Sequence, residues 1–225
     1  MKKAILISIR PEWVEKILNG EKTIEIRKSM PKCELPIDVY IYCSKPNKYP
    51  NTSNGNKTQI LSFDKSTNKY RLWRSSYGKV LNGKVVAKFT LNKIEEIKLE
   101  FTDHPELGYG INENCGDDWY EWESDDLLEK CCLTYDELYE YGNHEDIYAW
   151  HIDNLQIFDK PMELNEFYRN NWLPIFETTS CDKYDCEFKV DNSILGDDGF
   201  CRKSQCPKLR VRKPPQSWQY VNVVE

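Results

Sequence analysis

Three arrangements of hydrophobic and polar positions follow one another over residues 4–27, and each predicts an element. Residues 4–9 are almost all apolar, which is typical of a strand buried on both faces. Pro11 suits the first turn of a helix, because its missing N–H would have no partner there. The apolar face of that helix collects Trp13, Val14, Ile17 and Leu18. Gly20 follows where a left-handed cap is expected, so the helix is short and must pack on the strand.

A second strand over residues 22–27 carries polar chemistry. Alternation puts Ile24 and Ile26 on one face, and Thr23, Glu25 and Arg27 on the other. Glu25 and Arg27 are therefore neighbours that can pair or meet a ligand together. Lys22 has the opposite parity, and it joins them only if the turn before it redirects its side chain.

The rest of the chain predicts further strands and a few short helices. We expect strands over residues 37–43, 83–91, 94–99, 149–158 and 220–224, a hairpin from 60–63 and 70–73, a turn at 159–161 and a short helix over 162–169. Residues 134–137 fit a capping box that starts a helix, which stops at residues 142–143. Residues 44–58 have the composition of an exposed loop.

One motif resembles a known family. Gly20-x-Lys22-x-x-Glu25-x-Arg27 follows a strand end, Ser8-Ile9-Arg10-Pro11, and an amphipathic helix. This order resembles the ASCH domains of the PUA-like superfamily, as do the later segments 83–89 and 148–161, especially in prophage-encoded proteins. The resemblance covers about the first 165 residues. It implies an α+β fold, a PUA-like mixed β-barrel with short flanking helices.

The resemblance also implies a cleft that receives a base of RNA or a modified nucleoside. The ligand-binding residues would be Ser8, Arg10, Lys22, Thr23, Glu25 and Arg27. From the residues alone, the Lys22, Glu25 and Arg27 set is better read as a surface ion pair on an exposed strand face, worth at most about 1 kcal/mol; the resemblance reverses that preference.

A hydrolase is the alternative function. Some similar ASCH proteins remove the acetyl group of N4-acetylcytidine, with a lysine at the position of Lys22 and a threonine nucleophile at that of Glu25. This chain keeps the lysine but has a carboxylate in place of the alcohol. Glu25 could then act as a general base on water, with Lys22 as its electrostatic partner, on a modified nucleoside or on RNA.

The net charge of −6 is unevenly distributed. Residues 102–146 hold fifteen acidic residues and one lysine, a local charge of −14, so the remainder of the chain carries +8. A nucleic-acid surface on that remainder is therefore compatible with the acidic average. The acidic segment is either a solvated insertion packed by its aromatic residues or a nucleic-acid mimic that binds a basic host protein.

The nine cysteines point to a reducing compartment. No apolar run is long enough for a membrane span, and the short run after Met1 is better read as a strand than as a signal peptide, so a cytoplasmic location is expected. Cys181, Cys186, Cys201 and Cys206 form two Cys-x4-Cys pairs, which suit a structural zinc ion. Packed free thiols, or disulfides in an oxidised preparation, are the alternatives.

The change of composition near residue 170 predicts two domains. Residues 1–170 would form the ASCH/PUA-like domain with insertions at 44–80 and 102–146, and residues 171–225 a Cys-rich basic module. Nucleic-acid contacts are expected from Arg202, Lys203, Lys208, Arg210, Arg212, Lys213 and Trp218. Alternatively, these charges solvate a zinc module or pair with the acidic insertion. By resemblance, Trp218 would anchor the tail onto the barrel.

Overall fold

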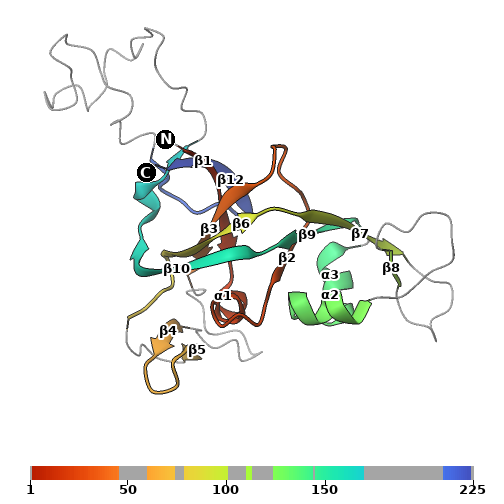
Figure 1. Cartoon of the computed structure of the whole chain (residues 1–225), viewed down its shortest axis with the longest axis horizontal. Coiled ribbons are helices and arrows are strands. Elements are labelled where there is room, and N and C mark those ends of the chain that lie inside the picture. Colours follow the sequence, from red (N-terminus) through yellow and green to blue (C-terminus); the bar gives the residue numbers. More distant parts are fainter. Residues whose placement is uncertain are drawn as a thin grey trace, which may run out of the picture.

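The computed structural model describes residues 2–45, 60–73, 79–100, 110–112, 124–143, 145–169 and 210–223. Over these residues the fold is α+β, mostly strands with a few short helices (Figure 1). The elements are β1 (Lys2–Ile9), α1 (Pro11–Leu18), β2 (Ile24–Arg27), β3 (Ile37–Cys43), β4 (Ile60–Asp64), β5 (Lys69–Trp73), β6 (Val85–Leu91), β7 (Ile94–Glu100), β8 (Gly110–Asn112), α2 (Ser124–Cys131), α3 (Tyr135–Gly142), β9 (Ile147–His151), β10 (Asp153–Met162), the 3-10 helix η2 (Leu164–Glu166), β11 (Tyr168–Arg169) and β12 (Trp218–Val223).

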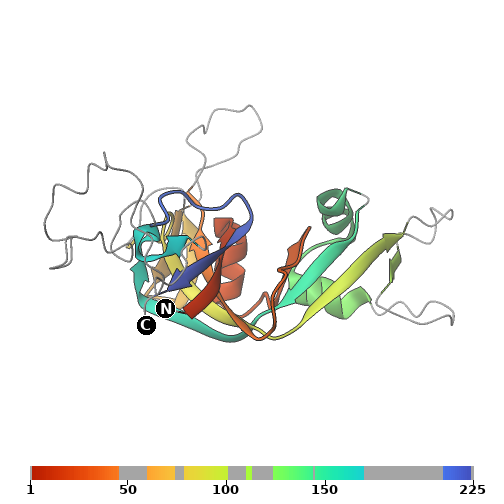
Figure 2. The same cartoon turned by 90° about the horizontal axis from the view of Figure 1, so that it is seen from above.

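A six-stranded sheet forms the centre of the fold, in the order β10-β6-β3-β1-β12-β11. Strand β1 is parallel to β3 and antiparallel to β12. The register of β1 and β12 pairs Lys2 with Val223, so the two ends of the chain lie side by side in Figures 1 and 2. The last described strand is thus an inner strand of the same sheet as the first.

Strand β1 is buried on both faces, as its apolar run predicts. Ile5, Ile7 and Ile9 enter the core that contains Val14 and Ile17 of α1. Ala4 and Leu6 enter a second core on the other face, with Phe167, Val211 and Val221. Helix α1 is therefore held by its packing on the sheet, and Gly20 adopts the expected left-handed backbone, with φ of +76°.

The hairpin of β4 and β5 packs against the same helix. Asn19, at the end of α1, donates to the carbonyl of Tyr70 at 3.0 Å and accepts from its N–H at 3.0 Å. The Leu72 N–H donates to the Glu15 carboxylate at 3.3 Å. These bonds attach the predicted hairpin to the outer side of α1 (Figure 1).

A four-stranded sheet, β2-β9-β7-β8, carries the other two helices. A third core lies between this sheet and the helices and includes Ile24, Ile26, Ile97, Leu127, Leu138 and Ile147. Figure 2 shows α2 and α3 beside β2 and away from β1 and β12. The capping box that starts α3 is confirmed, because the Thr134 hydroxyl accepts from the Glu137 N–H while Glu137 accepts from the Thr134 N–H.

The segment after residue 147 differs from its prediction in three places. The predicted strand over residues 149–158 is two strands, separated at Ile152, whose N–H donates to the Thr23 carbonyl at 2.9 Å. The predicted turn at residues 159–161 is wrong, because β10 continues to Met162. Strand β10 lies at the edge of its sheet, where a proline is tolerated, and the pairing shifts register between Ile157 and Met162.

The predicted helix over residues 162–169 is only one 3-10 turn followed by the short strand β11. Glu163 and Glu166 cap the start of this turn reciprocally, and the extended backbone of Phe167 ends it after three residues. Phe167 then enters the second core, so an apolar anchor stops the helix from continuing.

Several predictions fall outside the described residues. They include the four paired cysteines, the basic residues Arg202, Lys203 and Lys208, and most of the acidic segment. The zinc ion, the domain boundary near residue 170 and the basic protein partner therefore stay predictions. In the described ranges, no group of histidine, cysteine and acidic side chains is arranged to hold a metal ion, and no helix is long and apolar enough to span a membrane.

Candidate functional site

A cavity of about 580 Å³ opens between the end of β1, helix α1, strand β2, helix α3 and the segment before β12. The residues that line it come from parts of the chain that are far apart in sequence: Ser8, Ile9, Arg10, Trp13, Lys22, Glu25, Ile26, Arg27, Ser44, Leu133, Glu137, Glu140, Tyr141, Gln216 and Ser217. Most of the motif that the sequence singles out thus lies in one cleft.

Three charged side chains at this cleft are buried and form an ion triad. Lys22, Glu25 and Arg27 are each less than 8% exposed. An Arg27 Nη2 to Glu25 Oε1 distance of 2.9 Å and a Lys22 Nζ to Glu25 Oε2 distance of 3.5 Å give each carboxylate oxygen its own cation. The triad therefore carries a net positive charge at the cavity.

The turn after α1 brings Lys22 into the triad. The N–H groups of Glu21 and Lys22 both donate to the Lys16 carbonyl, at 2.8 and 3.2 Å, past the left-handed Gly20. The Lys22 ammonium then donates to the carbonyl of Cys131 at 2.6 Å. Because Cys131 ends α2, a cation there is favoured by the helix dipole and by an otherwise unpaired carbonyl.

Arg27 connects the motif to the C-terminal segment. Its Nη2 donates to the Ser8 carbonyl at 2.9 Å, and its Nη1 donates to the Ser217 hydroxyl at 3.3 Å. The Ser8 hydroxyl in turn donates to the Pro215 carbonyl at 2.7 Å. The Arg27 Nε is buried without a hydrogen-bond partner among the described residues, so the guanidinium keeps one donor unused.

Two aromatic side chains contribute to the lining. The Trp13 ring has the Lys22 ammonium 5.3 Å from its centre, and the Tyr141 ring has the Lys28 ammonium at 5.5 Å. Burial raises the pKa of the Tyr141 hydroxyl above its usual value of 10.0. The cavity is thus lined by flat aromatic rings next to the charged ion triad.

The sequence of residues 7–161 matches the family model of the ASCH domain. The chain belongs to the ASCH domain family. ASCH domains are generally RNA-binding, and the α+β arrangement is consistent with the PUA-like fold. The motif from Gly20 to Arg27 lies entirely inside the matched range.

Solved structures of one ASCH protein are similar to this chain. The crystal structure of ASCH from Zymomonas mobilis is 14% identical, with a TM-score of 0.45, and the match covers 97% of this chain and 87% of that one. A tyrosine-to-phenylalanine mutant of the same protein matches at 14% identity and a TM-score of 0.44, over 97% of this chain and 90% of the other. A serine-to-alanine mutant of that protein matches at 14% identity and a TM-score of 0.45, over 98% of this chain and 89% of the other. No curated protein matches the chain.

The structure brings together five of the six predicted ligand-binding residues of the ASCH motif. Ser8, Arg10, Lys22, Glu25 and Arg27 line the cavity. Thr23 does not, because its side chain is exposed and its backbone bonds to α2 and to Ile152. The sequence reasoning missed Trp13, which shares an apolar helix face with core residues, and Tyr141, Gln216 and Ser217, which no local pattern links to the motif.

The predicted nucleic-acid residues divide into two groups where the structure describes them. Arg210, Arg212 and Lys213 line a second cavity next to the first. Trp218 packs instead on Trp150 and Tyr220, with ring centres 5.7 and 5.5 Å away, and its Nε1 donates to the Ser29 hydroxyl at 3.1 Å. It therefore anchors the C-terminal segment onto the sheet.

Proposed function

We propose that this ASCH domain binds RNA or a modified nucleoside by receiving a base in the cleft over Lys22, Glu25 and Arg27. The observation that carries the proposal is the buried ion triad at a cavity with aromatic residues in its lining. Its volume of about 580 Å³ falls in the range of small-molecule sites, roughly 300 to 1,000 Å³, which is enough for a nucleoside.

The triad is costly for stability alone, which supports a role in binding. Desolvating three charged groups offsets most of their mutual attraction, and apolar replacements of buried ion pairs are often neutral or stabilising. A fold that needed only a filled core here would be served as well by apolar side chains. The triad does provide a fixed set of donors and acceptors against which a polar base edge can bind.

The individual groups suit a nucleobase. Trp13 and Tyr141 supply aromatic rings, and base stacking on such rings is largely independent of sequence. The Gln216 amide in the lining can both donate to and accept from the edge of a base. A modified base is then selected by how its substituent fits between these groups.

Hydrolysis of a modified nucleoside such as N4-acetylcytidine, or of RNA, is the second candidate function. The 3.5 Å distance from Lys22 Nζ to Glu25 Oε2 supports it, because a carboxylate could take a proton from water while the ammonium stabilises the developing oxyanion. Both carboxylate oxygens are already paired with cations, which favours binding over base catalysis. Under hydrolysis, Glu25→Gln would retain ligand but stop turnover.

Equilibrium dialysis against the nucleosides of enzymatically digested cellular RNA tests the binding function. We expect the wild type to retain at least one nucleoside and Arg27→Ala to lose at least ten-fold in affinity. Arg71→Ala is the matched control, because that arginine pairs with Asp64 on the β4–β5 hairpin and does not line the cavity. Circular dichroism verifies that each variant is folded. Equal retention by Arg27→Ala and the wild type would exclude this cleft.

A further inference from the structure

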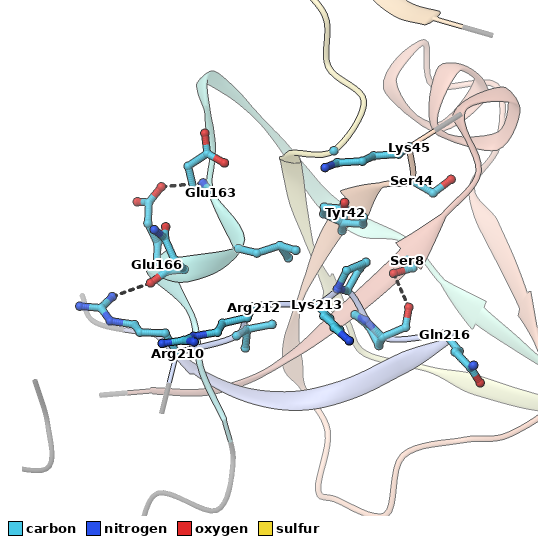
Figure 3. Close-up of a pocket in the computed structure, with 16 residues that line it drawn as sticks. Ser8, Tyr42, Ser44, Lys45, Glu163, Glu166, Arg210, Arg212, Lys213 and Gln216 are labelled. Carbon is cyan, nitrogen blue, oxygen red and sulfur yellow. Dashed lines mark hydrogen bonds between the residues drawn. The ribbon is translucent and has the colours of Figure 1, made fainter. Parts of the chain in front are cut away.

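A second cavity, of about 1180 Å³, lies next to the cleft. The two share Ser8, Ser44 and Gln216 in their linings, so they are separated only by the end of β1 and the segment before β12. Figure 3 shows Ser8 and Gln216 at one side of the second cavity and Arg210 and Glu166 at the other. A ligand longer than one nucleoside can therefore reach from one cavity into the other.

Four cationic side chains line this second cavity: Lys45, Arg210, Arg212 and Lys213. Its two acidic residues are already engaged within the protein. Glu163 pairs with Lys84, and the Glu166 carboxylate accepts from the Glu163 N–H at 2.6 Å. The positive charge thus exceeds what the lining itself can neutralise.

Two of the cations are held in place by specific contacts. Arg210 stacks its guanidinium on the Tyr168 ring at 4.1 Å and donates to the Asn165 carbonyl at 2.8 Å. The stem of Lys45 lies over Gly83, where an added Cβ would come within 2.9 Å of the lysine Cε. The glycine thus leaves room for the lysine that Figure 3 shows beside the cavity.

Arg212 and Lys213 are exposed, and neither forms an ion pair within the described ranges. Pro214 and Pro215 follow them directly, and the Pro215 carbonyl accepts the Ser8 hydroxyl. Two stiff residues fastened to β1 therefore fix where this pair of cations lies relative to the cleft.

We propose that the second cavity binds the backbone phosphates of a single-stranded RNA whose base occupies the cleft. This proposal rests on the proposed function: a phosphate is expected in the second cavity because it would belong to the same RNA strand as the base in the cleft. Cationic side chains fix the register of a nucleic acid through its phosphates, while the groups around the base provide recognition. The natural ligand of this ASCH domain is then an oligonucleotide rather than a free nucleoside.

Two pools of randomised RNA hexamers test the proposal, one with natural phosphodiester linkages and one with uncharged methylphosphonate linkages. Fluorescence anisotropy measures the affinity of the full chain for each pool. We expect the wild type to bind the charged pool at least ten-fold more tightly, and the double variant Arg212→Ala/Lys213→Ala to lose that preference. The salt dependence should fall by about 0.7 in log–log slope for each lost phosphate contact.

The control removes the same charge elsewhere. Lys65→Ala/Lys69→Ala takes two exposed cations from the β4–β5 hairpin, which lines neither cavity, and should keep the wild-type preference. Equal binding of both pools by the wild type would overturn the phosphate site and leave the base site standing. A preference that survives in Arg212→Ala/Lys213→Ala would also overturn it. Binding of neither pool would overturn the phosphate site as well, and the nucleoside dialysis then tests the base site by itself.

Discussion

The Lys22 ammonium donates to the carbonyl of Cys131 at 2.6 Å, although the two residues are 109 positions apart. The preceding carbonyl of α2, that of Lys130, accepts from the Thr23 N–H at 2.9 Å. The end of α2 is therefore capped by the start of the motif, and the lysine is held by the same contact that satisfies the helix. This arrangement makes the ion triad part of the fold as well as of the cleft.

Removing the carboxylate of the triad should destabilise the protein more than removing one of its cations. Glu25→Gln leaves two buried cations facing each other, and we expect the free energy of unfolding to fall by about 3 kcal/mol. Lys22→Met leaves Glu25 paired with Arg27, and the expected loss is about 2 kcal/mol. Urea denaturation measures both.

The control for this comparison is the exposed pair of Asp126 and Lys130 on α2. Asp126→Asn should change the free energy of unfolding by less than about 0.5 kcal/mol, because exposed pairs of this spacing contribute little. If Glu25→Gln lowered the free energy of unfolding by no more than Asp126→Asn does, the triad would contribute no more to stability than an exposed ion pair.

Tyr141 should act in binding through its ring rather than its hydroxyl. Tyr141→Phe keeps the ring and removes only the hydroxyl, which is uncharged at physiological pH because its pKa lies above 10.0. We expect the Tyr141→Phe variant to bind RNA as tightly as the wild type does. The Tyr141→Ala variant should lose about 1 to 3 kcal/mol of binding free energy. Anisotropy titrations decide between them, and a loss in Tyr141→Phe equal to that in Tyr141→Ala would refute the stacking role.

Asp64 should make the β4–β5 hairpin sensitive to acid. Hydrogen bonds from the Ser66 and Thr67 hydroxyls, at 2.7 and 2.8 Å, hold the pKa of its carboxyl below the usual 3.8. A pKa lower in the folded state means that the stabilisation is present above the unfolded pKa and is lost as pH falls through the folded one.

The stability advantage of the wild type over Asp64→Asn should therefore shrink between about pH 5 and about pH 2. Urea midpoints of both proteins across that range measure it. The isosteric amide is the control for shape. An advantage that stays constant across the range would mean that the ionised carboxylate does not stabilise the hairpin.

The paired cysteines provide a prediction about metal content. Protein purified under reducing conditions should contain about one zinc ion per chain, because four thiolates satisfy its tetrahedral preference. Cys186→Ser should lose the metal, whereas Cys33→Ser, which changes a free cysteine of the described fold, should keep it. Elemental analysis of the three proteins gives the answer, and a wild type without zinc would refute the proposed site.

Local patterns in the sequence predicted much of the fold. The apolar run of β1, the helix between Pro11 and Gly20 and the capping box at Thr134 each depend on neighbouring residues, and each forms as expected. The break at Ile152 was not predictable in this way, because it accompanies a hydrogen bond to Thr23, which lies just before the distant strand β2. Strand β10 likewise tolerates Pro161 only because of its place at the sheet edge.

The candidate site was predictable only on one side. The alternation of the strand predicted that Glu25 and Arg27 lie on the same face, and the family resemblance added Lys22. Alternation alone would put Lys22 on the other face, but the turn past Gly20 brings its side chain to Glu25. The opposite side of the cleft is formed by α3 and by the segment before β12, which lies there because β12 pairs with β1. Such contacts follow from strand pairing over the whole chain, so Tyr141 and Ser217 carry no sign of the cleft in their own surroundings.

Retention and conversion of nucleosides by the full chain test the central claim most directly. The wild type and Glu25→Gln are each incubated with a mixture of modified nucleosides that includes N4-acetylcytidine, and bound ligand and products are followed by mass spectrometry. We predict that the wild type retains a nucleoside without converting it. A product formed by the wild type and not by Glu25→Gln would establish the hydrolase instead, and a wild type that retains and converts nothing would contradict a base-binding cleft.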